Sequence, residues 1–218
     1  MARVAIVLAG GDPVEPSIRR MLPADAYVVA ADAGLHLAEP LHLHVDCVVG
    51  DFDSADPHAL HAAEQAGATI ERHPAEKDAT DLELALAAAQ RAGAERIVLV
   101  GGAGGRLDHF LANVGLLAHP RFAALHIEAL LGGSRVTVVA GGGVPTELRA
   151  VPGDLVTLLP VGGDARGVTT KGLEYPLHGE TLGVGTTRGV SNVVVEVPVS
   201  VELDAGTLLA VQPLGGAQ

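Results

Sequence analysis

The sequence predicts an α/β protein in two parts: an N-terminal α/β domain with a parallel sheet over residues 1–140, and a smaller all-β sandwich domain over residues 145–218. In the first part, short β-branched runs alternate with helical stretches, which is typical of a parallel sheet covered by helices. After three consecutive glycines at 141–143, only short runs rich in Val, Thr and Leu remain, with Gly, Pro and Asp between them. This second pattern favours a small sandwich of about 70 residues.

Within the first part, six short apolar runs are expected to be strands. They cover residues 3–8, 27–31, 47–49, 69–71, 97–100 and 125–130. The clearest helix covers residues 81–92, because Thr80 opens a capping box, apolar residues line one face and Gly93 follows as a stop signal. A second helix is expected to begin near Leu107 and to end before Pro120.

The β part lacks a helical period, and three of its apolar runs are the best strand candidates. They cover residues 155–159, 193–197 and 207–211. Residues 141–143 are expected to be a hinge or a simple loop before this part begins.

Composition excludes several functions. The 218 residues hold 14 Lys and Arg against 26 Asp and Glu, a formal charge of −12, and no basic run is longer than Arg19-Arg20. A nucleic-acid partner and a basic membrane-surface helix are therefore not expected. No apolar run approaches the ~20 residues of a membrane-spanning helix. The sequence start lacks signal-peptide regions, and the single Cys47 fits a reducing compartment, so a cytoplasmic protein is expected.

The first candidate site is Gly50-Asp51-Phe52-Asp53-Ser54, directly after the expected strand at 47–49. Ligands of open α/β sheets collect at the carboxyl ends of strands, and paired carboxylates there suit Mg²⁺. The alternative is a solvated turn with an Asp helix cap. Asp46, just before the same strand, is expected to close a loop on the side of Asp51 and to assist the metal site or the substrate.

The second candidate is Lys77-Asp78-Ala79-Thr80-Asp81, at the start of the clearest helix. Asp78 and Asp81 are three residues apart, so both can face one point, while Thr80 is expected to cap the helix. The alternative is an acidic first turn that only suits the helix dipole. A second acid pair at the end of a neighbouring strand favours the functional interpretation.

The third candidate is the glycine-rich segment 101–109, which reads GGAGGRLDH and lies between a strand and a helix. Glycines let backbone N–H groups approach an anion, and the helix N-terminus favours negative charge. The segment fits neither the GxGxxG pattern nor a Walker A loop. Arg106 is a good phosphate ligand, and Asp108 suits a further metal ligand or a base.

Together, the three segments are expected to bring five acids and a phosphate loop to one edge of one sheet. The acids are Asp51, Asp53, Asp78, Asp81 and Asp108. Clustered carboxylates repel one another unless metal ions neutralise them. The residues therefore point to Mg²⁺-dependent chemistry on a polyphosphate.

These residues resemble the thiamine pyrophosphokinase family through nearly the whole chain. The resemblance rests on Ala31-Asp32-Ala33-Gly34, Val45-Asp46 with segment 50–54, segment 77–86, segment 104–113, and, in the β part, segments 172–177 and 189–192. It implies Mg²⁺-dependent transfer of pyrophosphate from ATP to the hydroxyl of thiamine, which gives thiamine diphosphate and AMP. It also implies a homodimer whose site lies between the subunits.

The resemblance assigns roles to individual positions. The five acids named above match the Mg²⁺ and catalytic cluster. ATP ligands are implied at Lys77, Thr80, Gly102, Gly104, Gly105 and Arg106. Substrate-binding positions are implied at Asp32, Asp46, Ser191 and Asn192.

Three alternatives remain from the sequence. The first is a pyrophosphokinase acting on another hydroxymethyl heterocycle such as a pterin, and the second is a non-catalytic protein that binds a nucleotide or thiamine. The third is an aspartate-nucleophile phosphatase, since a strand followed by Asp-Phe-Asp-Ser resembles the first motif of those enzymes; there the motif follows the first strand, whereas here it follows the third expected one.

Overall fold

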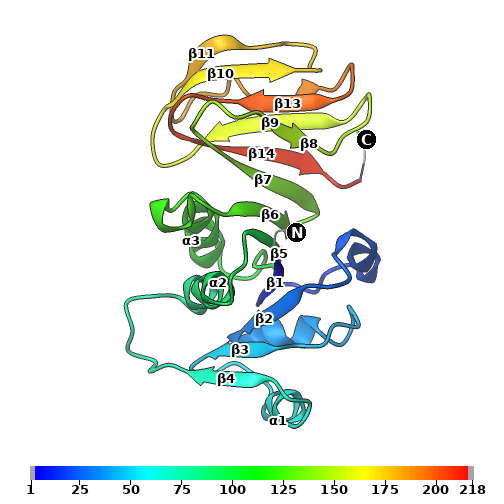
Figure 1. Cartoon of the computed structure of the whole chain (residues 1–218), viewed down its shortest axis with the longest axis vertical. Helices are drawn as coiled ribbons and strands as arrows, with labels where there is room; N and C mark the ends of the chain where they lie inside the picture. The colour runs from blue at the N-terminus through cyan, green and yellow to red at the C-terminus, as the bar shows by residue number, and fades with distance from the viewer. Residues whose placement is uncertain (1–2, 216–218) are drawn as a thin grey trace. The chain divides into compact units, whose positions relative to one another are not determined.

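The computed structural model describes residues 3–215, and they form two compact units (Figure 1). The first unit runs to Leu116 and includes Ala124–Gly132, and the second contains Leu117–Ala123 and the chain from Gly133 onward. Residues 134–140, placed by the sequence in the first part, form strand β7 (Ser134–Ala140) of the second unit. Strand β7 pairs along its whole length with the distant β14 (Thr207–Pro213), and such a long-range pairing leaves no local signal in the sequence.

A parallel sheet of six strands forms the centre of the first unit. The strands are β1 (Val4–Ala9), β2 (Tyr27–Ala31), β3 (Cys47–Gly50), β4 (Thr69–Arg72), β5 (Arg96–Gly101) and β6 (His126–Leu131). Their order is β6-β5-β1-β2-β3-β4, and every pair within it is parallel. The six strands expected from the sequence are confirmed, with ends that differ by one residue at most.

The two helices whose bounds the sequence predicts are confirmed: α2 (Asp81–Arg91) and α3 (Leu107–Leu117). A further helix, α1 (Pro57–Gln65), lies between β3 and β4. Short 3-10 helices are η1 (Pro16–Met21) and η2 (Asp32–Leu37) in the first unit and η3 (Pro120–Phe122) in the second. Thr80 caps α2 as expected, because its hydroxyl accepts a hydrogen bond from the Glu83 N–H at 3.3 Å. Buried Leu82, Ala85, Leu86 and Ala89 give α2 its apolar face.

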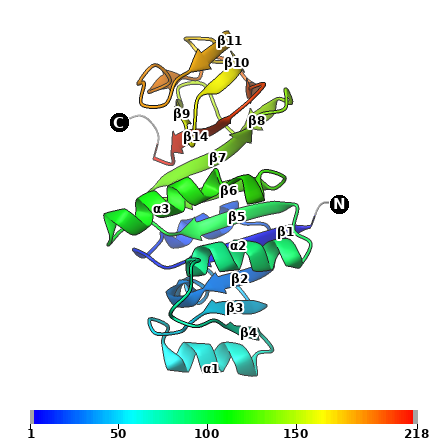
Figure 2. The same ribbon diagram turned by 90° about the vertical axis from the view of Figure 1, so that its left-hand side faces the viewer.

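The sheet is covered on both faces because its central strands are apolar on both sides. Alternate residues such as Ile6 and Leu8 of β1 pack with Leu35 and Leu41, in and after η2, into one buried cluster. Helix α2 contacts β1, β2 and β3, and Figure 2 shows α2 and α3 in front of the sheet. Burial on both faces explains why these strands read as continuous apolar runs.

The connections place a topological switch point between β1 and β5. From β1 the chain proceeds outward through β2, β3 and β4, then returns to β5 on the other side of β1. Ligands of open α/β sheets bind at the carboxyl edge near such a point. The loops after β1, β2, β3, β4 and β5 all leave from this edge, so the candidate motifs of the first unit share it.

The second unit is a sandwich of antiparallel strands. Beyond β7 and β14 it contains β8 (Thr146–Leu148), β9 (Leu155–Pro160), β10 (Ala165–Lys171), β11 (His178–Leu182), β12 (Asn192–Val193) and β13 (Val199–Glu202). One layer has the order β12-β9-β14-β7 and the other β11-β10-β13-β8. One buried cluster joins residues of both layers, for example Val156 and Leu208 with Val168 and Val201. The expected all-β sandwich is confirmed.

One expected strand of this unit is mostly absent. Of the apolar run 193–197, only Val193 belongs to a strand, β12, and Val194 forms an isolated bridge with Leu173. Val195 and Val197 are 54% and 50% exposed. The run therefore has β-branched composition without a strand partner beyond Val194, which composition alone does not reveal.

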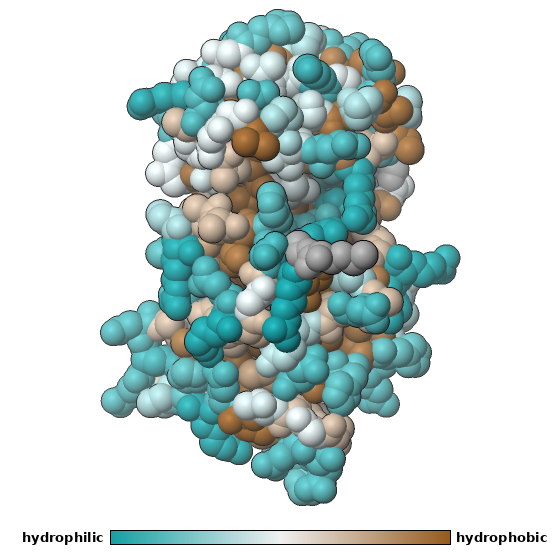
Figure 3. Space-filling model, viewed as in Figure 1, coloured by the Kyte–Doolittle hydropathy of each residue, from teal (hydrophilic) through white to brown (hydrophobic). Residues whose placement is uncertain are grey.

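Within residues 3–215, no helix is long and apolar enough to cross a membrane. Figure 3 shows hydrophobic residues among hydrophilic ones on one face of the molecule.

Candidate metal and phosphate site

Three carboxylates meet at the carboxyl ends of two neighbouring strands. Asp32 follows β2, and Asp51 and Asp53 follow β3. The parallel register pairs Ala31 with Val49, so Asp32 comes level with Gly50. One oxygen from each of Asp32, Asp51 and Asp53 lies within 4.8 Å of the other two, a spacing that suits a single cation.

Asp32 is the buried member of this group. Its side chain is 8% exposed, and its Oδ1 atom is buried without a hydrogen-bond partner among the described residues. Burial raises the pKa of Asp32 above its ordinary value, a backbone hydrogen bond from Ala33 opposes this, and the charges of Asp81, Asp51 and Asp53 raise it further. A buried carboxylate oxygen without a partner costs free energy unless a cation or a proton satisfies it.

The turn after β3 points both of its acids toward one place. Phe52, between them, has a φ of 64°, a left-handed conformation that is uncommon for a bulky residue. The Asp53 N–H donates to Asp51 Oδ1 at 3.2 Å, and the Ser54 hydroxyl donates to Asp53 Oδ1 at 2.8 Å. The Phe52 ring packs against the core, with the Arg72 guanidinium 4.8 Å from its centroid, and this packing anchors the turn.

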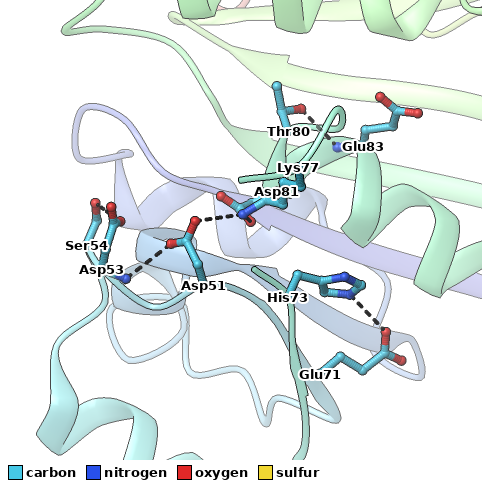
Figure 4. Close-up of polar contacts among 9 residues, drawn as sticks. All are labelled: Asp51, Asp53, Ser54, Glu71, His73, Lys77, Thr80, Asp81 and Glu83. Carbon is cyan, nitrogen blue, oxygen red and sulfur yellow. Dashed lines mark hydrogen bonds and ion pairs between the residues drawn. The ribbon is translucent and has the colours of Figure 1, made fainter. Parts of the chain in front are cut away.

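Lys77 connects this group to the start of α2 (Figure 4). Its Nζ lies 2.7 Å from Asp51 Oδ2 and 3.0 Å from Asp81 Oδ1, and its side chain is only 14% exposed. Burial alone would lower the pKa of Lys77, but hydrogen bonds to Asp51 and Asp81 outweigh it and raise the pKa. The hydrogen bond from Lys77 in turn lowers the pKa of Asp51. Lys77 is therefore a charged lysine between two carboxylates.

The structure brings together only part of the expected five-acid cluster. Asp51, Asp53 and, through Lys77, Asp81 are neighbours, and Asp32 joins them. Asp78 is exposed and lies outside the group of three carboxylates. Asp108 also lies outside it, at the start of α3, because β5 is three strand spacings, or about 14 Å, from β3.

The glycine-rich loop after β5 depends on conformations that only glycine adopts easily. Gly102, Gly104 and Gly105 have φ angles of 82°, 94° and 62°. The Asn113 side chain of α3 donates to the Gly102 carbonyl at 3.0 Å and fixes the loop to the helix. Such a loop at a helix N-terminus can present backbone N–H groups to an anion.

Arg106, the expected phosphate ligand, is paired with Asp108. Its guanidinium donates to both carboxylate oxygens, at 3.2 and 2.6 Å. This hydrogen-bonded pair lowers the pKa of Asp108 to about 2. Both side chains are well exposed, at 69% and 65%, so Arg106 can exchange this partner for a phosphate with little loss of burial.

The loop after β1 also belongs to this edge, although it is not among the candidate segments predicted from the sequence. The Asp12 N–H donates to the Ala103 carbonyl at 2.8 Å, and a side chain on Gly104 would overlap the Asp12 carboxylate. The loop follows a strand and contains Gly10-Gly11, and this glycine pair directly after the first strand was the available signal.

Asp46 is not at this edge, which corrects the expectation that it lies on the side of Asp51. Asp46 comes directly before β3 and Asp51 directly after it, so the two lie at opposite ends of a four-residue strand. The Asp46 carboxylate accepts a hydrogen bond from the Val28 N–H at 2.8 Å. It connects the starts of β2 and β3 and is occupied structurally.

The two polar residues expected in the β unit differ in availability. Ser191 is exposed with a φ of 57°, and its N–H donates to the Thr157 hydroxyl at 2.9 Å. Asn192 is buried, and both ends of its amide bond to backbone: Oδ1 accepts from the Tyr175 and Val193 N–H groups, and Nδ2 donates to the Tyr175 carbonyl at 2.8 Å. Asn192 therefore shapes the segment around Tyr175.

The first unit thus defines a doubly wound α/β protein with a carboxylate site and a glycine-rich loop at its carboxyl edge. Family models identify the chain further. Residues 18–129 match the catalytic domain of thiamin pyrophosphokinase, and residues 144–208 match its vitamin B1 binding domain. The chain belongs to the thiamine pyrophosphokinase family.

Curated relatives agree with this assignment. Thiamine pyrophosphokinase from Bacillus subtilis is 28% identical over 163 residues, which cover 75% of this chain and 76% of the relative. Thiamine pyrophosphokinase 1 from Oryza sativa subsp. japonica is 28% identical over 169 residues, which cover 73% of this chain and 63% of the relative.

Solved structures share the fold along the whole chain. Thiamin pyrophosphokinase from Geobacillus thermodenitrificans has a TM-score of 0.79 at 27% identity, with 99% of this chain and 98% of that one covered. A thiamin pyrophosphokinase family protein from Enterococcus faecalis has a TM-score of 0.77 at 29% identity, with 97% and 99% covered. The alternatives of a pterin pyrophosphokinase and of a non-catalytic binder find no support in these comparisons.

Proposed function

We propose that this protein transfers pyrophosphate from ATP to the hydroxyl of thiamine with the help of Mg²⁺, and releases AMP. In this reaction the thiamine oxygen forms a bond to the β-phosphorus, the bond from that phosphorus to the α-phosphate oxygen breaks, and the hydroxyl loses its proton. The observation that carries the proposal is the grouping of Asp32, Asp51 and Asp53 in a chain whose two halves match the catalytic and vitamin B1 binding models in order.

The donor set at the acid group fits Mg²⁺. Hard divalent cations prefer carboxylate oxygens, and the buried Asp32 Oδ1 without a partner is the kind of atom that such an ion satisfies. Asp32, Asp51 and Asp53 would hold the ion, with Asp81 joined to them through Lys77. When bound, Mg²⁺ offsets the negative charge of the triphosphate and of the leaving group.

The ATP phosphates would lie along the carboxyl edge between the two loops. Gly102, Gly104 and Gly105 would offer backbone N–H groups, and Arg106 would offer its guanidinium. Lys77 would contribute positive charge at the acid end. Thr80 acts through its cap, which fixes the start of α2 and with it the position of Asp81.

The acceptor side would come from the β unit. Ser191 is exposed and free to meet a substrate, whereas Asn192 would hold the exposed Tyr175 segment in place. The vitamin B1 binding model covers both residues.

We also propose a cytoplasmic homodimer in which the β unit of one subunit completes the site of the other. Leu107 and Leu111 lie one turn apart on α3 and are 69% and 58% exposed, and Val190 beside Ser191 is 45% exposed. Exposed apolar side chains of this size support contact with another protein surface, and a second copy of the chain is the simplest such partner.

Purified protein with ATP, Mg²⁺ and thiamine tests the reaction. Chromatography should resolve thiamine diphosphate and AMP in equal amounts. Asp53→Asn should abolish turnover with an unchanged circular dichroism spectrum. Release of inorganic phosphate without thiamine diphosphate, or an active Asp53→Asn variant, would contradict the proposal.

Mixing two inactive variants tests the shared site. Asp53→Asn damages the α/β unit, and Ser191→Arg should block the β unit by bulk. If each site combines units from two subunits, mixed dimers hold one undamaged site, and random exchange should restore about one quarter of the wild-type activity. If each site lies within one subunit, the mixture stays inactive.

A further inference from the structure

We propose that Lys77 is a built-in counter-ion that keeps the affinity of the acid site for free Mg²⁺ low, so that the ion binds well only together with a nucleotide. This inference rests on the proposed function, because it concerns the metal and nucleotide of that same site. It assigns Lys77 a task that differs from simple contact with ATP.

The ammonium group of Lys77 lies directly against one of the three grouped carboxylates. Lys77 Nζ lies 2.7 Å from Asp51 Oδ2, while Asp51 Oδ1 accepts from the Asp53 N–H. Asp51 thus belongs to the Lys77 pair and to the group of three carboxylates at once. A divalent ion bound to that group would lie close to a fixed positive charge on the same carboxylate.

Partial burial strengthens the electrostatic effect of the Lys77 charge on its neighbours. Lys77 is 14% exposed, Asp51 16% and Asp81 27%, so water screens their interactions only partly. Asp81 holds Lys77 from the other side at 3.0 Å, four residues along the chain at the start of α2. The ammonium is therefore placed by two partners on two elements, and Figure 4 shows it between them.

The local charges determine in which direction Lys77 changes the affinity for each ligand. The group contains Asp32, Asp51, Asp53 and Asp81, and Lys77 is the cation paired directly with two of them. For free Mg²⁺, Lys77 is a competing cation that occupies Asp51 and repels the ion. A nucleotide triphosphate adds several negative charges, and toward that ligand the same ammonium is attractive. Removal of the charge should therefore change the two affinities in opposite directions.

Metal titration of the whole protein without nucleotide tests the proposal. Mn²⁺ replaces Mg²⁺ as the probe, and electron paramagnetic resonance measures the concentration of Mn²⁺ that remains unbound. Lys77→Met should bind Mn²⁺ about tenfold more tightly than wild type, since one nearby like charge is removed. The same variant should show a KM for Mg·ATP that is higher by about tenfold.

The chain offers a matched control. Lys77 and Lys171 are its two lysines, and Lys171 is an exposed residue at the end of β10 in the other unit. Lys171→Met should leave Mn²⁺ binding unchanged. Lys77→Arg keeps the charge and should keep the weak Mn²⁺ binding of wild type, and Lys77→Gln repeats the neutral change if the methionine variant does not fold.

Unchanged or weaker Mn²⁺ binding in both neutral variants would overturn the proposal. A merely structural role for Lys77 predicts that result, because a disordered site would lose affinity for both ligands. The metal titration contains no nucleotide and no thiamine, so its outcome is separate from that of the turnover assay, which tests the proposed reaction.

Discussion

Asp32 packs directly against Gly50, the last residue of the neighbouring strand. A Cβ atom built on Gly50 would lie 3.0 Å from the Asp32 Cβ, closer than real side chains normally approach. The register of β2 and β3 brings these residues level, so the buried carboxylate has its place because position 50 lacks a side chain.

Gly50→Ala should therefore displace Asp32 from the acid group. The φ of Gly50 is not in the left-handed region, so the effect comes from the contact and not from backbone strain. We expect at least tenfold weaker Mn²⁺ binding and a comparable loss of turnover, because displacement of one ligand removes a charge-assisted contact. Gly163→Ala, at a position with nothing within 4 Å of the added Cβ, should change neither. Wild-type metal affinity in Gly50→Ala would contradict this account of Asp32.

Asp32→Asn should change how stability depends on pH. A carboxyl group whose pKa is raised on folding binds its proton more tightly in the folded state, so the folded state loses stability as pH rises from the ordinary value of 3.8 through the raised pKa. The asparagine variant does not have this loss. In EDTA, the free energy of unfolding of Asp32→Asn should rise relative to that of wild type as the pH increases through this window. The difference should then stay constant at higher pH.

Urea unfolding at a series of pH values measures this difference. Asp25→Asn changes an exposed acid in a turn and should run parallel to wild type. Parallel curves for Asp32→Asn as well would show that the Asp32 carboxylate carries no burial penalty.

Arg106→Met should raise the pKa of Asp108. The hydrogen-bonded guanidinium is the main reason that this pKa is about 2, and the His109 N–H contributes less. The pKa should therefore return most of the way to the ordinary value of 3.8. Carboxyl carbon shifts in an NMR titration would report it, and a titration of Asp108 that is the same in both proteins would exclude the pair in solution.

Asn192→Ala should destabilise the protein by about 1–2 kcal/mol, because it leaves partly buried backbone groups of Tyr175 and Val193 without these partners. Asn192→Asp keeps an acceptor oxygen but puts a second, charged oxygen against the Tyr175 carbonyl at a buried position, so it should destabilise the protein at least as much. Urea denaturation gives both values. Equal stability of all three proteins would mean that the amide does not hold this segment.

Local patterns in the sequence determined much of the fold. Alternation of apolar runs with helical stretches predicts the six strands of the first unit, and Thr80 with Gly93 predicts α2, because capping and strand burial depend on neighbouring residues. The strand predicted over residues 193–197 is wrong for most of its length. Its β-branched residues favour a strand, but a strand also needs a partner, and pairing depends on distant segments.

The candidate site, too, was predicted from the sequence only in part. Motif chemistry in the sequence points to Asp51 and Asp53 as acids at a strand end and to the glycine-rich loop as a phosphate site. Asp46 does not belong to the site, because the length of β3, about 13 Å, separates it from Asp51. The expected strand itself predicts this separation, since the two residues flank it at opposite ends.

Tertiary structure alone decided which charges meet. Asp32 and Asp51 are 19 positions apart in the chain, and the parallel register of β2 and β3 makes them neighbours. Lys77 reaches Asp51 across 26 positions because α2 starts over the same edge. A sequence specifies residue types and local conformation, whereas burial and charge neighbours depend on strand register and packing, which arise only when distant segments come together.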